Sequence, residues 1–508
     1  MSQLAAPAAM QQLFVSLSLA LGSASVAIAF GLPLAVLLAR ARIFGGRIAW
    51  AIIAALIFAP LYVHLAGWDA LGAWLGLFGR NAPQAILSGL PSAIWVHGVA
   101  AAPWAAILIS VGLTQVPRQE EEQALLETSP SIVFWRIVLP RLLPWIATAG
   151  CFAAVSSWYE MTVTNVYLVP TVTEGVYNQV AGNATHEVIY LFPAYAVFGG
   201  LIALAAYSTR VLLVGDFRQL NQAPLFWSSQ RNLLSSGFVW LLLAILAGVP
   251  LLVLIRQTGL STRIVGTEAI REWTVNSFAA TLWKTAIVTR MDFWWTAVAG
   301  MSAATASVVI AVPLAWWASQ GSRLAPRDGS PWRYGLLFLL TILLLAIPGP
   351  LIALGIIKVM NQPTVGWLTF LYDRTVFAPA VAQTLRALPL VLLVVWHAVA
   401  QFDRLQLEAA QLDGCGPWQT LWRIVLPQRW PALFAAWLLG LGIAIGDVSC
   451  SLLVIPAGKD LIQRRLFGMI HSGVDNQVAA ACLLLIGVVT VIAAVSSRFK
   501  VSSLRLRN

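Results

Sequence analysis

The side chains that could carry out chemistry are few and scattered along this chain. Its 508 residues include four cysteines and five histidines, and no CxxC pair or other spacing typical of metal ligands occurs. No nucleophile lies in a recognisable pattern with a neighbouring base. We therefore expect no catalytic site, no metal centre and no bound cofactor, which disfavours an enzyme.

The sequence also lacks the pattern that binds the phosphates of ATP. The motif GxxxxGK[ST] does not occur, and the one Gly-Lys pair, Gly458-Lys459, is followed by Asp460. A glycine-rich loop followed by lysine and a hydroxyl side chain is needed to hold the phosphates and Mg²⁺. Any ATP hydrolysis that serves this chain is therefore expected to come from a separate partner.

Three charged residues stand close to or within long apolar runs. Glu160 and Asp447 take equivalent places in two similar segments, and Arg386 lies near the start of another apolar run. A charge in an apolar span is costly, which makes it a candidate for a functional site. We predict that these residues line a substrate pathway. The alternative is that each carboxylate bonds to nearby Ser and Thr residues in a polar mouth.

One polar segment occurs twice, at Glu121–Pro140 and at Leu407–Pro427, and both copies end in the hexapeptide WRIVLP. In the second copy, glycine and proline after a helix-forming stretch predict a helix, a turn and a second helix. Small residues would let another protein approach closely. The residues expected to contact that protein are Glu408, Ala409, Ala410, Gly414, Ile424, Leu426 and Pro427, and in the first copy Glu121, Ile137, Leu139 and Pro140.

These segments are embedded in a membrane protein. The chain is 59% hydrophobic and 10% charged, whereas soluble proteins carry about 25% charge. We predict an all-α polytopic membrane protein with about eleven spans of the length that crosses a bilayer. They are Leu13–Leu38, Ile48–Ala66, Ala93–Thr114, Leu142–Val163, Ile189–Leu213, Leu233–Ile255, Phe293–Ala318, Tyr334–Ile357, Ala378–Ala400, Ala432–Ile455 and Val478–Ser496.

Charge sets the expected orientation. The formal charge of +11 is explained by Arg and Lys in alternate loops, which face the cytoplasm, so no nucleic acid partner is expected. Both copies of the polar segment then lie in the cytoplasm, as does the C-terminus. No basic region precedes the first apolar run, so that run is expected to remain as a span.

The repeat predicts the domain organisation. Pro33 and Pro313, Pro60 and Pro348, and Glu160 and Asp447 occupy matching places in two halves. Two five-span units joined directly would face opposite ways, so an extra span must restore the direction. We predict a first unit at 1–216, a linker and connecting span at 217–257, and a second unit at 258–508. The two units are then parallel and pseudo-symmetric.

The second copy resembles the EAA loop of permease subunits from binding-protein-dependent ABC transporters. This resemblance implies the type I importer fold, and the length is similar to that of fused ferric-iron and thiamine permeases. It also implies two ATPase subunits docked at the EAA loops, a periplasmic or extracellular substrate-binding protein, surrounding lipid, and the bacterial inner membrane. The first copy departs from the pattern, since Glu122, Gln123 and Glu127 replace the two alanines and the glycine. Unequal coupling of the two copies is expected.

An ion-coupled secondary transporter is the alternative function. It would require several acidic or His residues in mid-span, and the few intramembrane charges argue against it. For the importer, ferric iron is the first expected substrate because of the length shared with fused permeases and the acidic pair Glu160 and Asp447. Thiamine, a polyamine or an oxyanion remain open.

Overall fold

The computed structural model describes residues 2–76, 89–182, 227, 232–265, 268–320 and 331–498. Almost all of these residues are helical, which confirms an all-α polytopic membrane protein. Within the described residues, seven helices are long and apolar enough to cross a membrane, or up to nine if each of two bent pairs counts as one span. The predicted count of eleven is not confirmed. The expected span Ile189–Leu213 lies outside the described residues.

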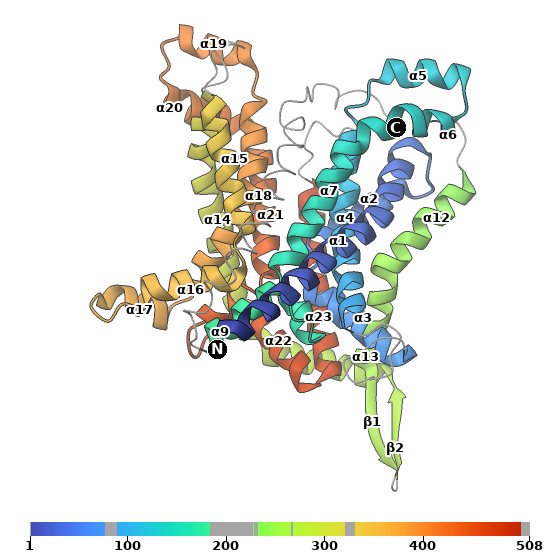
Figure 1. Cartoon of the computed structure of the whole chain (residues 1–508), viewed down its shortest axis with the longest axis vertical. Helices are drawn as coiled ribbons and strands as arrows, with labels where there is room; N and C mark the ends of the chain where they lie inside the picture. The colour runs from blue at the N-terminus through green and yellow to red at the C-terminus, as the bar shows by residue number, and fades with distance from the viewer. Residues whose placement is uncertain are drawn as a thin grey trace. The chain divides into compact units, whose positions relative to one another are not determined.

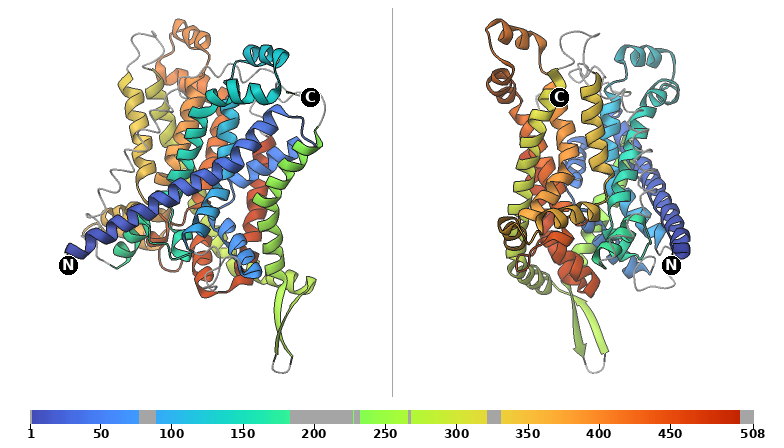
Figure 2. Two further views of the ribbon diagram at one scale, coloured as in Figure 1. Left: turned by 45° about the vertical axis from the view of Figure 1, so that its right-hand side comes forward. Right: turned by 60° about the vertical axis from the view of Figure 1, so that its left-hand side comes forward.

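The described residues form two compact units. The first contains residues 2–290 together with Arg464–Ala493, and the second consists mainly of Met291–Gln463. Helix α14 (Val275–Gln320) runs from one unit into the other, and η marks π- or 3₁₀-helical stretches. Figures 1 and 2 show the course of these elements. In the first unit they are α1 (Ser2–Arg40), α2 (Gly46–Ile57), α3 (Leu61–Leu75), α4 (Leu90–Leu113), α5 (Arg118–Glu127), α6 (Pro130–Val133), η1 (Phe134–Val138), α7 (Leu139–Tyr159), α8 (Thr162–Val166), α9 (Val172–Ala181), α12 (Leu233–Leu243), η4 (Ala244–Gly248), α13 (Val249–Gly259), β1 (Leu260–Val265) and β2 (Glu268–Trp273).

The second unit is built on α18 (Phe377–Ala400) and α21 (Leu426–Gly446), which pack against each other. Its other elements are α15 (Pro331–Ala346), α16 (Gly349–Met360), α17 (Gly366–Arg374), α19 (Arg404–Leu412), α20 (Pro417–Thr420), η5 (Leu421–Val425) and η6 (Leu452–Val454). Helices α22 (Ile462–Ser472) and α23 (Asp475–Arg498) follow in the chain and belong mostly to the first unit.

The core of the first unit is the contact of α1 with α4 and α7. Small side chains dominate it, among them Ala27, Ala105 and Ala149, all of them buried. A Cβ on Gly112 would come within 2.4 Å of the ring of Trp145, so only glycine lets α4 and α7 approach this closely. Close approach at small residues is the usual way in which membrane helices associate.

Two of the predicted spans are sharply bent. The pair α2 and α3 turns by 103° and the pair α15 and α16 by 97°. Pro60 and Pro348 sit at the bends in extended conformation, directly before the helices that follow. Proline cannot continue a helical hydrogen-bond ladder, so the chain restarts in a new direction. Ile48–Ala66 and Tyr334–Ile357 are therefore broken spans or re-entrant segments, not single continuous helices.

A two-stranded antiparallel hairpin follows α13 in the first unit. Strands β1 and β2 pair from Leu260 with Trp273 to Val265 with Glu268. In Figure 1 it extends from the opposite end of this unit to the one that carries α5 and α6. The sequence analysis did not anticipate these strands.

Candidate functional site: two polar helical hairpins

The second copy of the repeated segment forms a helical hairpin, α19 to α20, as its sequence predicts. Asp403 caps the start of α19, where its carboxylate accepts a hydrogen bond of 3.1 Å from the backbone of Leu405. Glu408 and Ala409 lie exposed on α19, whereas Ala410 is buried. The face that carries Glu408 and Ala409 is thus open to another protein.

A glycine in left-handed conformation ends α19. Gly414 has φ of +76°. Its N–H donates to the carbonyl of Gln411 at 3.0 Å, and the N–H of Cys415 donates to that of Ala410 at 2.9 Å. This pair of bonds is the Schellman arrangement, which requires a residue that tolerates positive φ. The turn is completed by Gly416, and Pro417 opens α20.

The hairpin leads into the membrane through a π-helical stretch. Residues Leu421–Val425 are π-helical and continue into α21. Pro427 lies at the start of α21, where it has no N–H to donate to the carbonyl of Arg423. A π turn absorbs such a local mismatch without ending the helix. Ile424 and Leu426 are half-buried and Pro427 is exposed.

The first copy has the same order of elements. Its π-helical stretch η1 and helix α7 match η5 and α21 residue for residue in the aligned sequences. Ile137 and Leu139 are half-buried and Pro140 is exposed, as at the matching positions of the second copy. The turn differs, because Ser129 and Pro130 form it without a left-handed residue.

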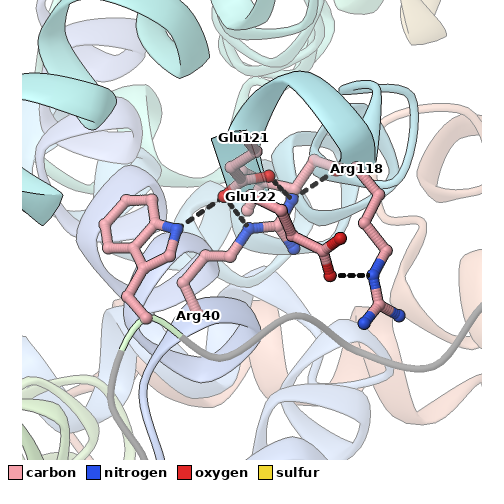
Figure 3. Close-up of polar contacts among 6 residues, drawn as sticks. Arg40, Arg118, Glu121 and Glu122 are labelled. Atoms are coloured by element: carbon pink, nitrogen blue, oxygen red, sulfur yellow. Dashed lines mark hydrogen bonds and ion pairs between the residues drawn. The ribbon is translucent and has the colours of Figure 1, made fainter. Parts of the chain in front are cut away.

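The motif glutamate of the first copy is placed differently from Glu408. Glu121 on α5 is 0% exposed. Its Oε1 accepts from Nε of Arg40 at 2.8 Å and from Nε1 of Trp227 at 2.5 Å, and its Oε2 accepts from a terminal guanidinium nitrogen of Arg40 at 3.0 Å. Figure 3 shows Arg40 and Glu121 facing each other. This carboxylate is therefore not at the surface, where the sequence analysis expected it to meet a partner.

The neighbouring glutamates of α5 are also paired. Glu122 accepts a bond of 2.6 Å from Nε of Arg118 on the same helix, and Glu120 pairs with Arg141 on α7. Both of these pairs are partly exposed. All three consecutive carboxylates of α5 thus bind arginines of this chain.

Large apolar side chains lie exposed on both hairpins. Leu126 on α5 and Leu412 on α19 are each 89% exposed, and Trp135 and Trp422 of the repeated hexapeptides are 64% and 65% exposed. Exposed apolar groups on a polar segment are typical of a surface that binds another protein or lipid headgroups.

The candidate pathway residues belong to different units, Glu160 to the first and Asp447 and Arg386 to the second. Glu160 follows α7, and its two oxygens accept from the backbone N–H and the hydroxyl of Thr162 at 2.7 and 2.6 Å. Asp447 follows α21 and is buried, with Oδ1 accepting from the backbone of Cys450 at 3.3 Å. Arg386 is buried on α18 of the same unit, and its charge interacts with Asp447. The contacts of Glu160 to Thr162 agree with the polar-mouth alternative, whereas the carboxylate of Asp447 bonds to the backbone of Cys450; a pathway role stays a prediction.

Sequence reasoning missed Arg40 and Trp227 as part of the first hairpin. Arg40 had been interpreted only as a cytoplasmic loop charge, and Trp227 lies 106 residues from Glu121. No local pattern in the sequence points to either contact.

Comparison with known proteins identifies the segment that carries the second hairpin. The family profile described as "Binding-protein-dependent transport system inner membrane component" matches residues 311–505. This range contains α18, the α19–α20 hairpin and α21. Residues 311–505 therefore resemble this permease family.

Several curated proteins to which this chain is similar are polyamine or molybdenum permeases. The spermidine/putrescine transport system permease protein PotC of Escherichia coli (strain K12) is 32% identical over 108 residues, which cover 21% of this chain and 41% of PotC. The putrescine transport system permease protein PotI of the same strain is 25% identical over 128 residues, 25% of this chain and 44% of PotI. The molybdenum transport system permease protein ModB of Azotobacter vinelandii is 27% identical over 172 residues, 32% of this chain and 74% of ModB. The chain thus spans about two fifths of the length of the polyamine permeases.

Proposed function

We propose that this chain is the permease subunit of an ATP-driven, binding-protein-dependent importer. The observation that carries the proposal is the α19–α20 hairpin, an exposed Glu-Ala pair followed by a left-handed glycine turn, within a segment that resembles the permease family. The α5–α6 hairpin, with its matching π-helical entry into α7, supplies a second site of the same kind.

In this proposal the two hairpins dock two ATPase subunits in the cytoplasm. Glu408 would meet a cation on the ATPase, and Ala409 would allow its surface to come close. Leu412 and Trp422 add apolar contact area. The chain then lies in the bacterial inner membrane with its C-terminus in the cytoplasm, and a substrate-binding protein docks on the opposite side of the membrane.

The proposed organisation keeps two parallel units, 1–216 and 258–508, and a connecting span within 217–257. Helices α12 and α13, joined by η4, form one apolar helix at Leu233–Gly259 that can serve as this span. The matching hairpins and the matching bends at Pro60 and Pro348 support a tandem repeat.

The proposed substrate is a polyamine or an oxyanion such as molybdate. The names of PotC, PotI and ModB support these two classes, and they give ferric iron no support. Buried Asp447 would suit a polyamine, and buried Arg386 would suit an oxyanion. Because the two charges attract each other, loss of either one would also disturb the other.

The decisive test is reconstitution of this chain with a candidate ATPase subunit from the same organism. The expected result is a stable complex in which binding protein loaded with substrate stimulates ATP hydrolysis and uptake into proteoliposomes. Glu408→Arg should weaken ATPase binding, whereas Lys358→Glu on α16, outside both hairpins, should leave it intact. Uptake that runs on an ion gradient without ATP would refute the importer.

A further inference from the structure

Glu121 joins three helices and Trp227, a residue of the predicted linker 217–257, at a single buried point. Besides its two bonds to Glu121, Arg40 donates from the same terminal nitrogen to the carbonyl of Leu113 at 2.8 Å. Arg40 is the last residue of α1 and Leu113 the last of α4, while Glu121 lies on α5 (Figure 3). The ends of α1 and α4 are therefore tied to the first hairpin.

Trp227 adds the linker to this point. Its indole N–H donates to Glu121, and its backbone N–H donates to the carbonyl of Arg40 at 2.9 Å. Its ring lies 6.2 Å, centroid to centroid, from that of Phe134 in the π-helical entry to α7. Trp227 thus contacts α1, α5 and η1 at once.

The chemistry of this cluster favours a rigid joint. Arg and a carboxylate match as planar partners with two parallel bonds, and such pairs have directional preference as well as strength. Since Glu121 is fully buried, removing one partner leaves a charge without compensation in a medium of low polarity. Glu121 cannot turn toward an ATPase without breaking both bonds to Arg40.

We infer that Glu121 is a positioning residue that fixes the first hairpin to the end of α1, and that it does not contact the ATPase. A push of the ATPase on α5 and α6 then moves the end of α1 and the linker at Trp227 together with the hairpin. Glu408, exposed at the matching position of the second hairpin, contacts the ATPase directly. This inference rests on the proposed importer function.

The first experiment measures the joint without the ATPase. The full chain in lipid nanodiscs is compared with Glu121→Gln and Glu408→Gln by amide hydrogen exchange. Exchange in α5 should become faster by about tenfold or more in E121Q, because a buried pair is broken, and exchange in α19 should not change in E408Q. Unchanged exchange of α5 in E121Q would overturn the joint.

The second experiment separates positioning from docking. In proteoliposomes with the ATPase, E121Q should keep ATPase affinity and lower the substrate transported per ATP hydrolysed, whereas E408Q should lower affinity. A normal transport ratio in E121Q, despite faster exchange, would reduce Glu121 to a purely structural role and overturn the inference. Weaker ATPase binding in E121Q with unchanged exchange would show direct contact and overturn it as well.

Trp227→Phe is a milder variant that still tests the inference if E121Q fails to fold. This variant removes the indole donor and keeps the Arg40–Glu121 pair, so exchange in α5 and the transport ratio should shift in the same direction by a smaller amount. A W227F chain identical to wild type in both measurements would contradict the role of the linker. If the wild-type chain binds no ATPase, the proposed function fails, and the exchange experiment still reports on the joint.

Discussion

Gly414 offers the sharpest test of why the second hairpin has its sequence. Its φ of +76° lies in the left-handed region, and a Cβ built on it would meet nothing within 4 Å in this chain. Packing therefore does not require glycine here. Two explanations remain, the conformation of the turn and room for a docked ATPase.

The turn alone predicts a modest effect of Gly414→Ala. The left-handed conformation costs an L-residue roughly 1–2 kcal/mol, which lowers the population of the native turn by a factor of about 5–30 relative to other turn conformations. Asn tolerates this conformation far better than Ala. Gly414→Asn should therefore preserve the turn while adding a larger side chain than Ala.

The assay is substrate-stimulated ATP hydrolysis of the reconstituted complex, with chain assembly measured in parallel. If the ATPase needs the space, both variants lose stimulation, and G414N loses at least as much as G414A. Gly458→Ala is the matched control, because Gly458 also has positive φ, +81°, and open space around its Cβ position, but lies in the loop between α21 and α22. Near-normal activity of G414N together with impaired G414A would refute a docking role for Gly414 and leave only the turn.

Three further predictions follow from buried charges. Glu121→Gln should destabilise the chain by roughly 3–5 kcal/mol, and the double variant R40M/E121M should recover most of this loss because apolar residues replace the whole pair. Chemical unfolding in detergent measures the stability of both variants. A double variant no more stable than E121Q would contradict this prediction. Burial raises the pKa of Glu174 on α9 above its ordinary value of 4.5, and a hydrogen bond of 3.2 Å from Asn165 opposes this shift. The protonated carboxyl therefore stabilises the fold fully below about pH 4.5, and this stabilisation is lost as the pH rises through the pKa of the folded state. The thermal unfolding temperature of the wild type should fall over this pH range, and that of E174Q should not. Equal pH profiles of the two chains would count against this prediction. Asp447→Asn should lower uptake of a polyamine by about tenfold or more, since one charged contact is removed, with the ATPase complex intact; unchanged uptake would place Asp447 outside the pathway.

Features with local causes could be predicted from the sequence. The second hairpin follows from helix formers, a glycine and a proline in order, and the break at Pro348 follows from the proline itself. The apolar runs identify a polytopic membrane protein, because that inference depends only on their length and composition. Hydropathy carries no direction, however, so it gives the extent of Ile48–Ala66 and Tyr334–Ile357 but not the size of the turn, about 100°, at each proline.

Features with distant causes could not be predicted. The burial of Glu121 depends on Arg40, 81 residues away, and on Trp227, 106 residues away. Sequence comparison of the two copies showed that Glu122, Gln123 and Glu127 depart from the motif, but it could not show that α5 uses its carboxylates within the chain. The strands of the β1–β2 hairpin, LSTRIV and EAIREW, do not alternate apolar and polar residues regularly, so no clear local pattern predicted them.

The π-helical stretches at the entries to α7 and α21 have a consequence for how such a permease could change during evolution. A π turn contains one residue more than the α turn that it replaces, and one residue corresponds to a rotation of about 100° around a helix axis. A single-residue deletion within Phe134–Val138 or Leu421–Val425 would restore α geometry and swing the hairpin around its span. The direction in which each docking surface points is therefore set by one residue of chain length, and such a deletion could redirect a hairpin toward a new ATPase surface while the membrane core stays as it is.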